Sequence, residues 1–88
     1  MSILSLNATC GTTATLIYAN RSSVAEVFIH NHSGGAIQVG GAGVTTANGL
    51  QINNNSTATV RIYAGDSLYA VTASGTATID LLITAPNP

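Results

Sequence analysis

Turn-forming residues interrupt this chain about every eight to twelve residues, and the runs between them carry apolar side chains at alternate positions. The pattern is clearest in two glycine-punctuated blocks, residues 40–50 and 65–78, which offer almost no chemically reactive groups. A period of two belongs to β-strands, whereas an amphipathic helix repeats every 3.6 residues. We therefore expect an all-β fold without a helix, and a scaffolding role rather than a catalytic one.

Several segments are expected to form strands, because each is rich in threonine, valine or isoleucine and ends at a turn signal. They are residues 12–18, 24–30, 36–39, 50–52, 57–63, 67–72 and 76–84, with a further short strand near 2–6. This pattern predicts a small antiparallel β-sandwich of about seven to eight short strands, in either a jelly-roll or an immunoglobulin-like variant. Residues 1–88 are expected to form a single domain, with 1–11 as an N-terminal arm or strand and 85–88 as a short tail.

The composition is unusual for a monomer of 88 residues, because hydrophobic residues make up 45% of the chain and charged residues only 6%. A domain of this size has a thin core and buries roughly 60–65% of the surface that its unfolded chain exposes. So few charges also do little to keep a monomer soluble. We therefore expect part of the surface to be covered by copies of the chain or by a partner.

Three segments begin Thr-Ala-Thr followed by an aliphatic residue, at residues 13–16, 57–60 and 76–79. In an extended strand every second side chain lies on the same face, so each segment has a core face and a wetter face that carries the threonines. The predicted core faces are Ala14, Leu16 and Tyr18; Ala58, Val60 and Ile62; and Ala77, Ile79, Leu81 and Ile83. Arg61 and Asp80 are expected on the wetter faces.

Three apolar residues do not fit this division, because Ile17 and Leu82 fall on the threonine faces and Phe28 shares its face with polar side chains. Isolated apolar residues on a surface are ordinary. The alternative is that they contact other subunits, which the shortage of charge favours, since the centres of obligate interfaces are depleted in charge. The predicted interface consists of Ile17, Phe28, His30, His32 and Leu82.

His30 and His32 are two residues apart on a predicted strand, so their side chains project to the same side. They could reach one metal ion or surround a symmetry axis. Zinc needs three or four ligands, and only Glu26 shares that face within the same run. We expect solvated or interfacial histidines and no metal site. The one cysteine, Cys10, has no partner for an internal disulfide and is expected to be a small packed or half-exposed thiol.

The charged residues exclude several further functions. The chain has no lysine and only two arginines, Arg21 and Arg61, so it cannot neutralise a run of phosphates or bind an anionic membrane. Two histidines and three carboxylates do not suggest a nucleophilic triad or a carboxylate pair. No lysine follows the glycines of residues 40–43, as a phosphate-binding loop would need. We expect no enzyme, no cofactor, no nucleic-acid partner and no membrane attachment.

Residues 31–50 (NHSGGAIQVGGAGVTTANGL), followed by 65–70 (GDSLYA) and 73–77 (ASGTA), resemble short β-rich virion proteins of tailed bacteriophages and prophages. The resemblance covers residues 24–83, and its motifs are specific as a combination. It implies a capsid decoration protein without catalytic residues. We therefore expect a homotrimer that binds the major capsid protein on the capsid exterior and stabilises the shell. Such a protein would be made in the host cytoplasm without a signal peptide, and the five predicted interface residues would contact the trimer or the capsid.

Two alternatives to a decoration protein stay open. One is an accessory protein of the tail or fibre. The other is a carbohydrate-binding adhesion module in which Tyr18, Tyr63 or Tyr69 stacks on sugar rings, although the absence of tryptophan weakens this hypothesis. Ice binding by the Thr-Ala-Thr segments is disfavoured because their spacing along the chain is unequal.

Overall fold

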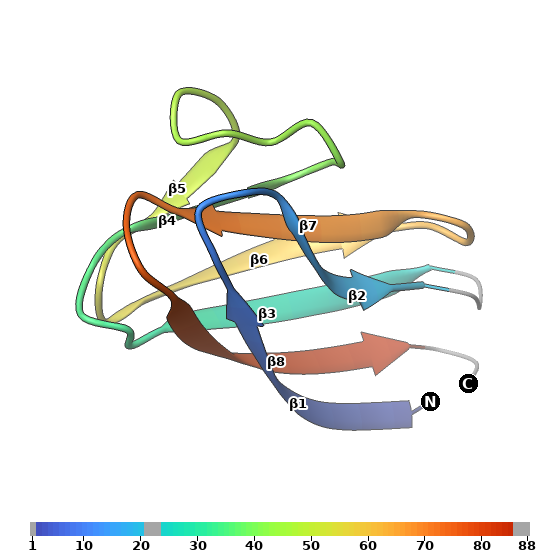
Figure 1. Ribbon diagram of the computed structural model, residues 1–88. Helices are drawn as coiled ribbons and strands as arrows, with labels where there is room; N and C mark the ends of the chain where they lie inside the picture. Colours follow the sequence, from blue (N-terminus) through green and yellow to red (C-terminus); the bar gives the residue numbers. More distant parts are fainter. Residues whose placement is uncertain (1, 21–23, 86–88) are drawn as a thin grey trace.

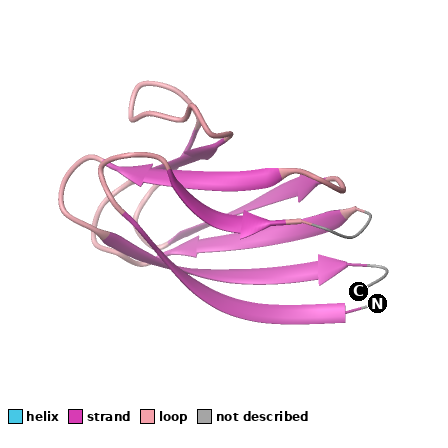
Figure 2. Cartoon of the chain, turned by 45° about the vertical axis from the view of Figure 1, so that its right-hand side comes forward, coloured by secondary structure: helices cyan, strands magenta, loops and turns pink. Residues whose placement is uncertain are grey.

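The chain folds into a β-sandwich of two four-stranded antiparallel sheets (Figure 1). The computed structural model describes residues 2–20 and 24–85. The strands are β1 (Ser2–Cys10), β2 (Thr15–Ala19), β3 (Ala25–Asn31), β4 (Ile37–Gly40), β5 (Leu50–Ile52), β6 (Ser56–Ile62), β7 (Ser67–Thr72) and β8 (Ala77–Ala85). Within these residues Figure 2 shows only strands and loops, and no helix there is long and apolar enough to span a bilayer. The predicted all-β antiparallel sandwich is confirmed.

The order of the strands identifies which sandwich this is. Sheet A has the order β1-β8-β3-β6, and sheet B has the order β2-β7-β4-β5. Only β4 and β5 are consecutive strands of one sheet, because every other connection crosses between the sheets. An immunoglobulin sandwich contains several hairpins within its sheets, so the crossing connections correspond to the jelly-roll variant.

The core lies between the inner faces of the two sheets. Strand β3 alternates strictly, and its inward side chains Ala25, Val27, Ile29 and Asn31 are all buried. The predicted core faces of β6 and β8 are confirmed, because all their members belong to the core cluster or pack against it: Ala58, Val60, Ile62, Ala77, Ile79, Leu81 and Ile83. Branched aliphatic side chains suit this position because they pack well on a pleated surface.

The predicted core face of β2, Ala14, Leu16 and Tyr18, is wrong at Leu16 but correct at Tyr18, which packs against the core cluster. Leu16 is 51% exposed, whereas Ile17 is 8% exposed and belongs to the core cluster. The strand begins in the opposite phase, because Thr15 pairs with the buried Ala70. The pairing with β7 then shifts at a β-bulge between Leu16 and Tyr18, so both Ile17 and Tyr18 contact the core. One extra residue reverses the alternation of side chains along the rest of the strand. Strand β2 is also shorter than predicted, since it begins at Thr15.

Strand β1 is longer than the short strand predicted near residues 2–6, and it forms one edge of sheet A. It pairs with β8 along its whole length, with Leu4 opposite Ile83 and Leu6 opposite Leu81. Leu4 and Leu6 are therefore on the inner side of the sheet, yet they are 46% and 36% exposed. Sheet B does not cover this part of β1, so apolar side chains stay at the surface.

Asn31 fastens the loops at one end of the sandwich. Its side chain is fully buried, and its amide nitrogen donates hydrogen bonds to the carbonyl oxygens of Gly35 (2.7 Å) and Ile52 (2.9 Å). Its amide oxygen accepts hydrogen bonds from the backbone nitrogen (3.1 Å) and the hydroxyl (2.7 Å) of Ser33. Because one side chain forms hydrogen bonds with both the loop after β3 and the end of β5, it connects sheet A to sheet B at this end.

The loop between β4 and β5 folds back on the end of β4, as seen at the top of Figure 1. Gly49 permits this with a φ of 92°, in the region that residues with a side chain rarely adopt. A Cβ atom at this position would lie 2.6 Å from Val44 Cγ2 and 2.8 Å from the Val39 carbonyl oxygen. Any residue other than glycine at position 49 would therefore clash with the buried Val44.

Candidate functional site on the outer face of sheet A

The outer face of sheet A, which points away from sheet B, is organised as rows of side chains that cross all four strands. The register of the strands determines these rows, because directly paired residues lie side by side on one face. One row is mainly polar and consists of Asn7, Asp80, His30 and Thr57. The next row consists of Ser5, Leu82, Phe28 and Thr59.

A shallow cleft of about 330 Å³ lies where these two rows meet. Its apolar lining consists of Phe28 and Leu82, which are direct cross-strand partners on β3 and β8, together with Leu6 and Leu81. Phe28 is half-buried and Leu82 is 39% exposed. The polar residues around them are Ser5, Asn7, His30, Thr57 and Asp80. The cleft thus places an apolar pair beside a row of hydrogen-bonding groups.

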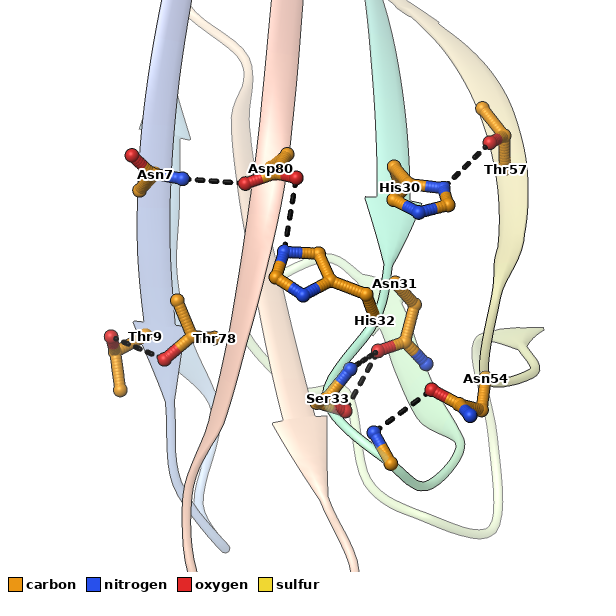
Figure 3. A network of polar contacts seen from close by, with 11 residues as sticks. Asn7, Thr9, His30, Asn31, His32, Ser33, Asn54, Thr57, Thr78 and Asp80 are labelled. Atoms are coloured by element: carbon orange, nitrogen blue, oxygen red, sulfur yellow. Dashed lines mark hydrogen bonds and ion pairs between the residues drawn. The ribbon is translucent and has the colours of Figure 1, made fainter.

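The polar row is held in place by its own hydrogen bonds (Figure 3). Asn7 Nδ2 donates to Asp80 Oδ1 at 2.5 Å, and His32 Nε2 lies 3.0 Å from Asp80 Oδ2. On the other side, His30 Nδ1 and Thr57 Oγ1 are 3.0 Å apart. The two imidazole rings stack, with their centroids 5.7 Å apart. The Asp80 carboxylate therefore bridges β1 to the segment that follows β3.

This arrangement does not build the chemistry of a hydrolase. In a nucleophilic triad one histidine connects the hydroxyl to the carboxylate. Here His30 contacts Thr57, whereas the Asp80 carboxylate contacts His32 instead. In the part of the chain that the structure describes, no group of three or more histidine, cysteine, aspartate or glutamate side chains is arranged to hold a metal ion.

The predicted interface residues divide into two groups in the structure. Phe28, His30 and Leu82 lie together on the outer face of sheet A, and His32 follows directly after β3. Ile17 is buried in the core, so the prediction that it projects from the opposite face is wrong. Whether the other four contact a second subunit stays a prediction.

Two residues of this site, Asn7 and Asp80, were not predicted to lie beside the histidines. Asp80 was expected on a wet face, but the sequence does not indicate which strand is its neighbour. The register of sheet A pairs Asp80 with His30 on one side and with Asn7 on the other. Strand alternation alone carries no signal for such a cross-strand cluster, because it specifies the face and not the neighbour.

The sequence matches no family model, and no curated protein sequence is significantly similar to it. Among solved structures, the fold is similar to a protein of Bacillus endospore appendages, which are described as a family of disulfide-linked pili. The TM-score is 0.61 with 18% sequence identity, over 93% of this chain and 82% of the appendage chain. At this identity the similarity establishes the shared fold.

This comparison contradicts the predicted resemblance to virion proteins of tailed phages. The predictions that depended on it are overturned as well: the capsid decoration function, the homotrimer bound to the major capsid protein, and the location on a capsid exterior. The physical reason lies in the motifs themselves. They consist mostly of glycine, asparagine and serine at tight turns, which any small sandwich needs in order to reverse its chain. Such motifs indicate where the chain turns and do not indicate common ancestry.

Proposed function

We propose that this chain is a non-enzymatic structural subunit that assembles with copies of itself into a fibre or surface appendage. The observation that carries the proposal is its fold similarity, over nearly the whole chain, to a protein of pilus-like endospore appendages. The shortage of charge supports it independently, because a chain with 6% charged residues gains from having its surface covered. The exposed edges of the two sheets supply a physical route for assembly.

The sandwich has two flanks at which its sheets end. Strands β1 and β6 are the edges of sheet A, and β2 and β5 are the edges of sheet B. Strand β1 lies near β2, and β5 lies near β6, so each flank presents one edge from each sheet. An edge strand carries backbone N–H and C=O groups that can pair with a strand of another chain. Both flanks are therefore sites where a second copy could add to the sheets.

The directions of the edge strands allow this addition to repeat. Sheet A has four antiparallel strands, so β1 and β6 run in opposite directions. If β1 of a second copy pairs antiparallel with β6 of the first, the second copy has the same orientation as the first. Such a head-to-tail contact leaves a new β6 edge for a third copy, and it generates a filament wherever the rotation does not close a ring.

The side chains at the flanks favour association over solubility. Natural edge strands are usually protected by lysine, proline or a bulge. Strand β1 contains no charged residue and no proline, and its Ile3, Leu4 and Leu6 are 68%, 46% and 36% exposed. Near the opposite flank, Leu50 on β5 and Tyr63 just after β6 are 50% and 60% exposed. Apolar surface is thus available on both partners of the proposed contact.

The covalent chemistry of such a fibre differs from that of the appendages it resembles. Those appendages are disulfide-linked pili. Among these 88 residues there is one cysteine, and one thiol can join a chain to a single other chain. A polymer of this chain would therefore be held by strand pairing and apolar contact.

The proposal is tested by introducing a positive charge at the β1 edge. In Leu4→Lys, neighbouring copies would have to bury an ammonium group, so we expect loss of fibres in electron micrographs and a monomer in sedimentation. Leu82→Lys is the matched control, because Leu82 has a similar exposure but lies on β8, in the interior of sheet A. It should assemble like the wild type. Circular dichroism of each variant verifies that it is folded.

If Leu4→Lys does not fold, Ile3→Lys replaces it, since Ile3 is 68% exposed and contributes little to the core. A wild-type protein that stays monomeric at high concentration would overturn the proposal. Assembly of both edge variants at the wild-type level would show that the β1 edge is not the contact.

A further inference from the structure

We propose that the cleft on the outer face of sheet A is a binding site for a neutral saccharide. The cleft places the apolar pair Phe28 and Leu82 beside Ser5 and the polar row. In that row Asp80 and His30 lie between Asn7 and Thr57. A sugar ring has the complementary chemistry, because its C–H groups form an apolar face and its hydroxyls surround that face. The inference is independent of whether the chain forms fibres.

The aromatic ring provides the surface on which a sugar can stack. Phe28 is half-buried at the centre of the sheet, between Leu82 on β8 and Thr59 on β6. A ring held by two neighbouring strands loses little conformational freedom when a ligand binds. None of the tyrosines suggested by the sequence lines this cleft, so the predicted stacking residues Tyr18, Tyr63 and Tyr69 are replaced in this proposal by Phe28.

The polar row offers hydrogen-bonding atoms in fixed positions. Asn7 Nδ2 is engaged by Asp80, and His30 Nδ1 is engaged by Thr57. Asn7 Oδ1 and His30 Nε2 form no hydrogen bond with the rest of the described chain, so both atoms are available to a ligand. Ser5 adds a hydroxyl that can donate or accept. A ligand that matches this row needs several donors and acceptors close together, as a sugar has.

The charge of the cleft selects a neutral ligand. Asp80 lines it with a carboxylate, which disfavours phosphates and acidic sugars. Its two oxygens already contact Asn7 and His32, so it attracts a free cation only weakly. The volume of about 330 Å³ is at the small end of ligand sites, which suits one or two sugar rings. A purely apolar ligand would displace water from the polar row without replacing its hydrogen bonds.

Repetition would strengthen such a site. A fibre built through the flanks leaves the outer face of sheet A uncovered in every copy, so the cleft would recur along its length. Multivalent contacts of this kind raise the apparent affinity by roughly 10²–10⁴ over that of a single site. This step rests on the proposed function, whereas binding by a single copy does not.

Saturation-transfer NMR on the full chain tests the proposal, because it detects ligand protons whether the protein is monomeric or assembled. The probes are cellobiose, lactose and N,N′-diacetylchitobiose, with sialic acid as an acidic comparison. We expect transfer to the ring C–H protons of at least one neutral probe, with a dissociation constant on the order of 1 mM. Phe28→Ala should weaken that binding at least about tenfold, and Asp80→Asn should weaken it by a smaller factor.

Tyr69→Ala is the matched control, since Tyr69 is a half-buried aromatic residue like Phe28 but lies on β7, in the interior of sheet B and outside the cleft. It should bind like the wild type. No transfer to any neutral probe would overturn the proposal, and so would equal binding by Phe28→Ala and the wild type. If Phe28→Ala does not fold, Leu82→Lys serves in its place, because a lysine would occupy the apolar part of the cleft. Assembly is scored separately by microscopy, so failure of this proposal is distinct from failure of the proposed function.

Discussion

Phe28 and Leu82 lie directly opposite each other on β3 and β8, at the centre of the outer face of sheet A. They are distant in the sequence, and each by itself is an ordinary apolar residue on a surface. Paired, they contribute to the apolar lining of a cleft that also has polar side chains on several sides. The inner face of the same two strands builds the core, so the strands that stabilise the sandwich also position the candidate binding site.

The buried amide of Asn31 should be one of the largest polar contributions to stability. Asn31→Ala would leave the Ile52 carbonyl oxygen without this donor in a buried position, and it would also remove the hydrogen bonds of Asn31 to Gly35 and Ser33. Each unsatisfied buried group costs about 1–3 kcal/mol, so we expect the free energy of unfolding to fall by about 2–4 kcal/mol. Urea titration followed by circular dichroism measures this. Asn53→Ala, at an exposed position, is the control and should change stability by less than about 1 kcal/mol.

Equal loss of stability in the two asparagine variants would contradict this account. It would mean that the turn after β5, and not the buried amide of Asn31, limits the stability of this end of the sandwich.

Strand alternation was sufficient to predict much of this fold. The inward faces of β6 and β8 follow a period of two without interruption, and their core residues agree with the structure. The prediction for β2 fails at Leu16 because the strand begins in the opposite phase, and a bulge at Ile17 then changes the phase again. Neither Leu16 nor Ile17 has a side chain that marks these changes. A bulge depends on how the neighbouring strand pairs, and that information is not local.

The candidate site was less predictable for the same reason. Phe28, His30 and Leu82 stood out by composition, but their neighbours depend on the register between distant strands. Asp80 reaches His32 only because β8 lies between β1 and β3 in sheet A. Function was the least predictable level. Turn residues that many sandwiches share suggested a phage protein, whereas the fold is similar to that of an endospore appendage protein.

Gly49 should tolerate no side chain. In Gly49→Ala the new Cβ would meet the Val39 carbonyl oxygen and Val44 Cγ2, in a backbone conformation that costs a further 1–2 kcal/mol, roughly, for a residue with a side chain. We expect the free energy of unfolding to fall by about 2–4 kcal/mol in total. Gly43→Ala is the matched control from the same loop, because a Cβ there has open space around it. Thermal unfolding of both variants measures the difference, and similar midpoints would show that the loop can move away without cost.

Cys10 should be unreactive in the folded protein and should have no part in holding assemblies together. The residue is 1% exposed at the end of β1, and burial raises the pKa of its thiol, which lowers the fraction of reactive thiolate. We expect negligible labelling by a thiol reagent until the protein is unfolded, and no change in assembly when a reductant is added. Cys10→Ala should assemble like the wild type.

Non-reducing denaturing gels provide the decisive measurement for the role of Cys10. A monomer band with and without reductant is the expected result, because strand pairing and apolar contact do not survive detergent and heat. A dimer band that disappears on reduction would show that Cys10 leaves the core and crosslinks two chains. In that case the edge strand β1, which carries Cys10, would have to separate from β8 during assembly.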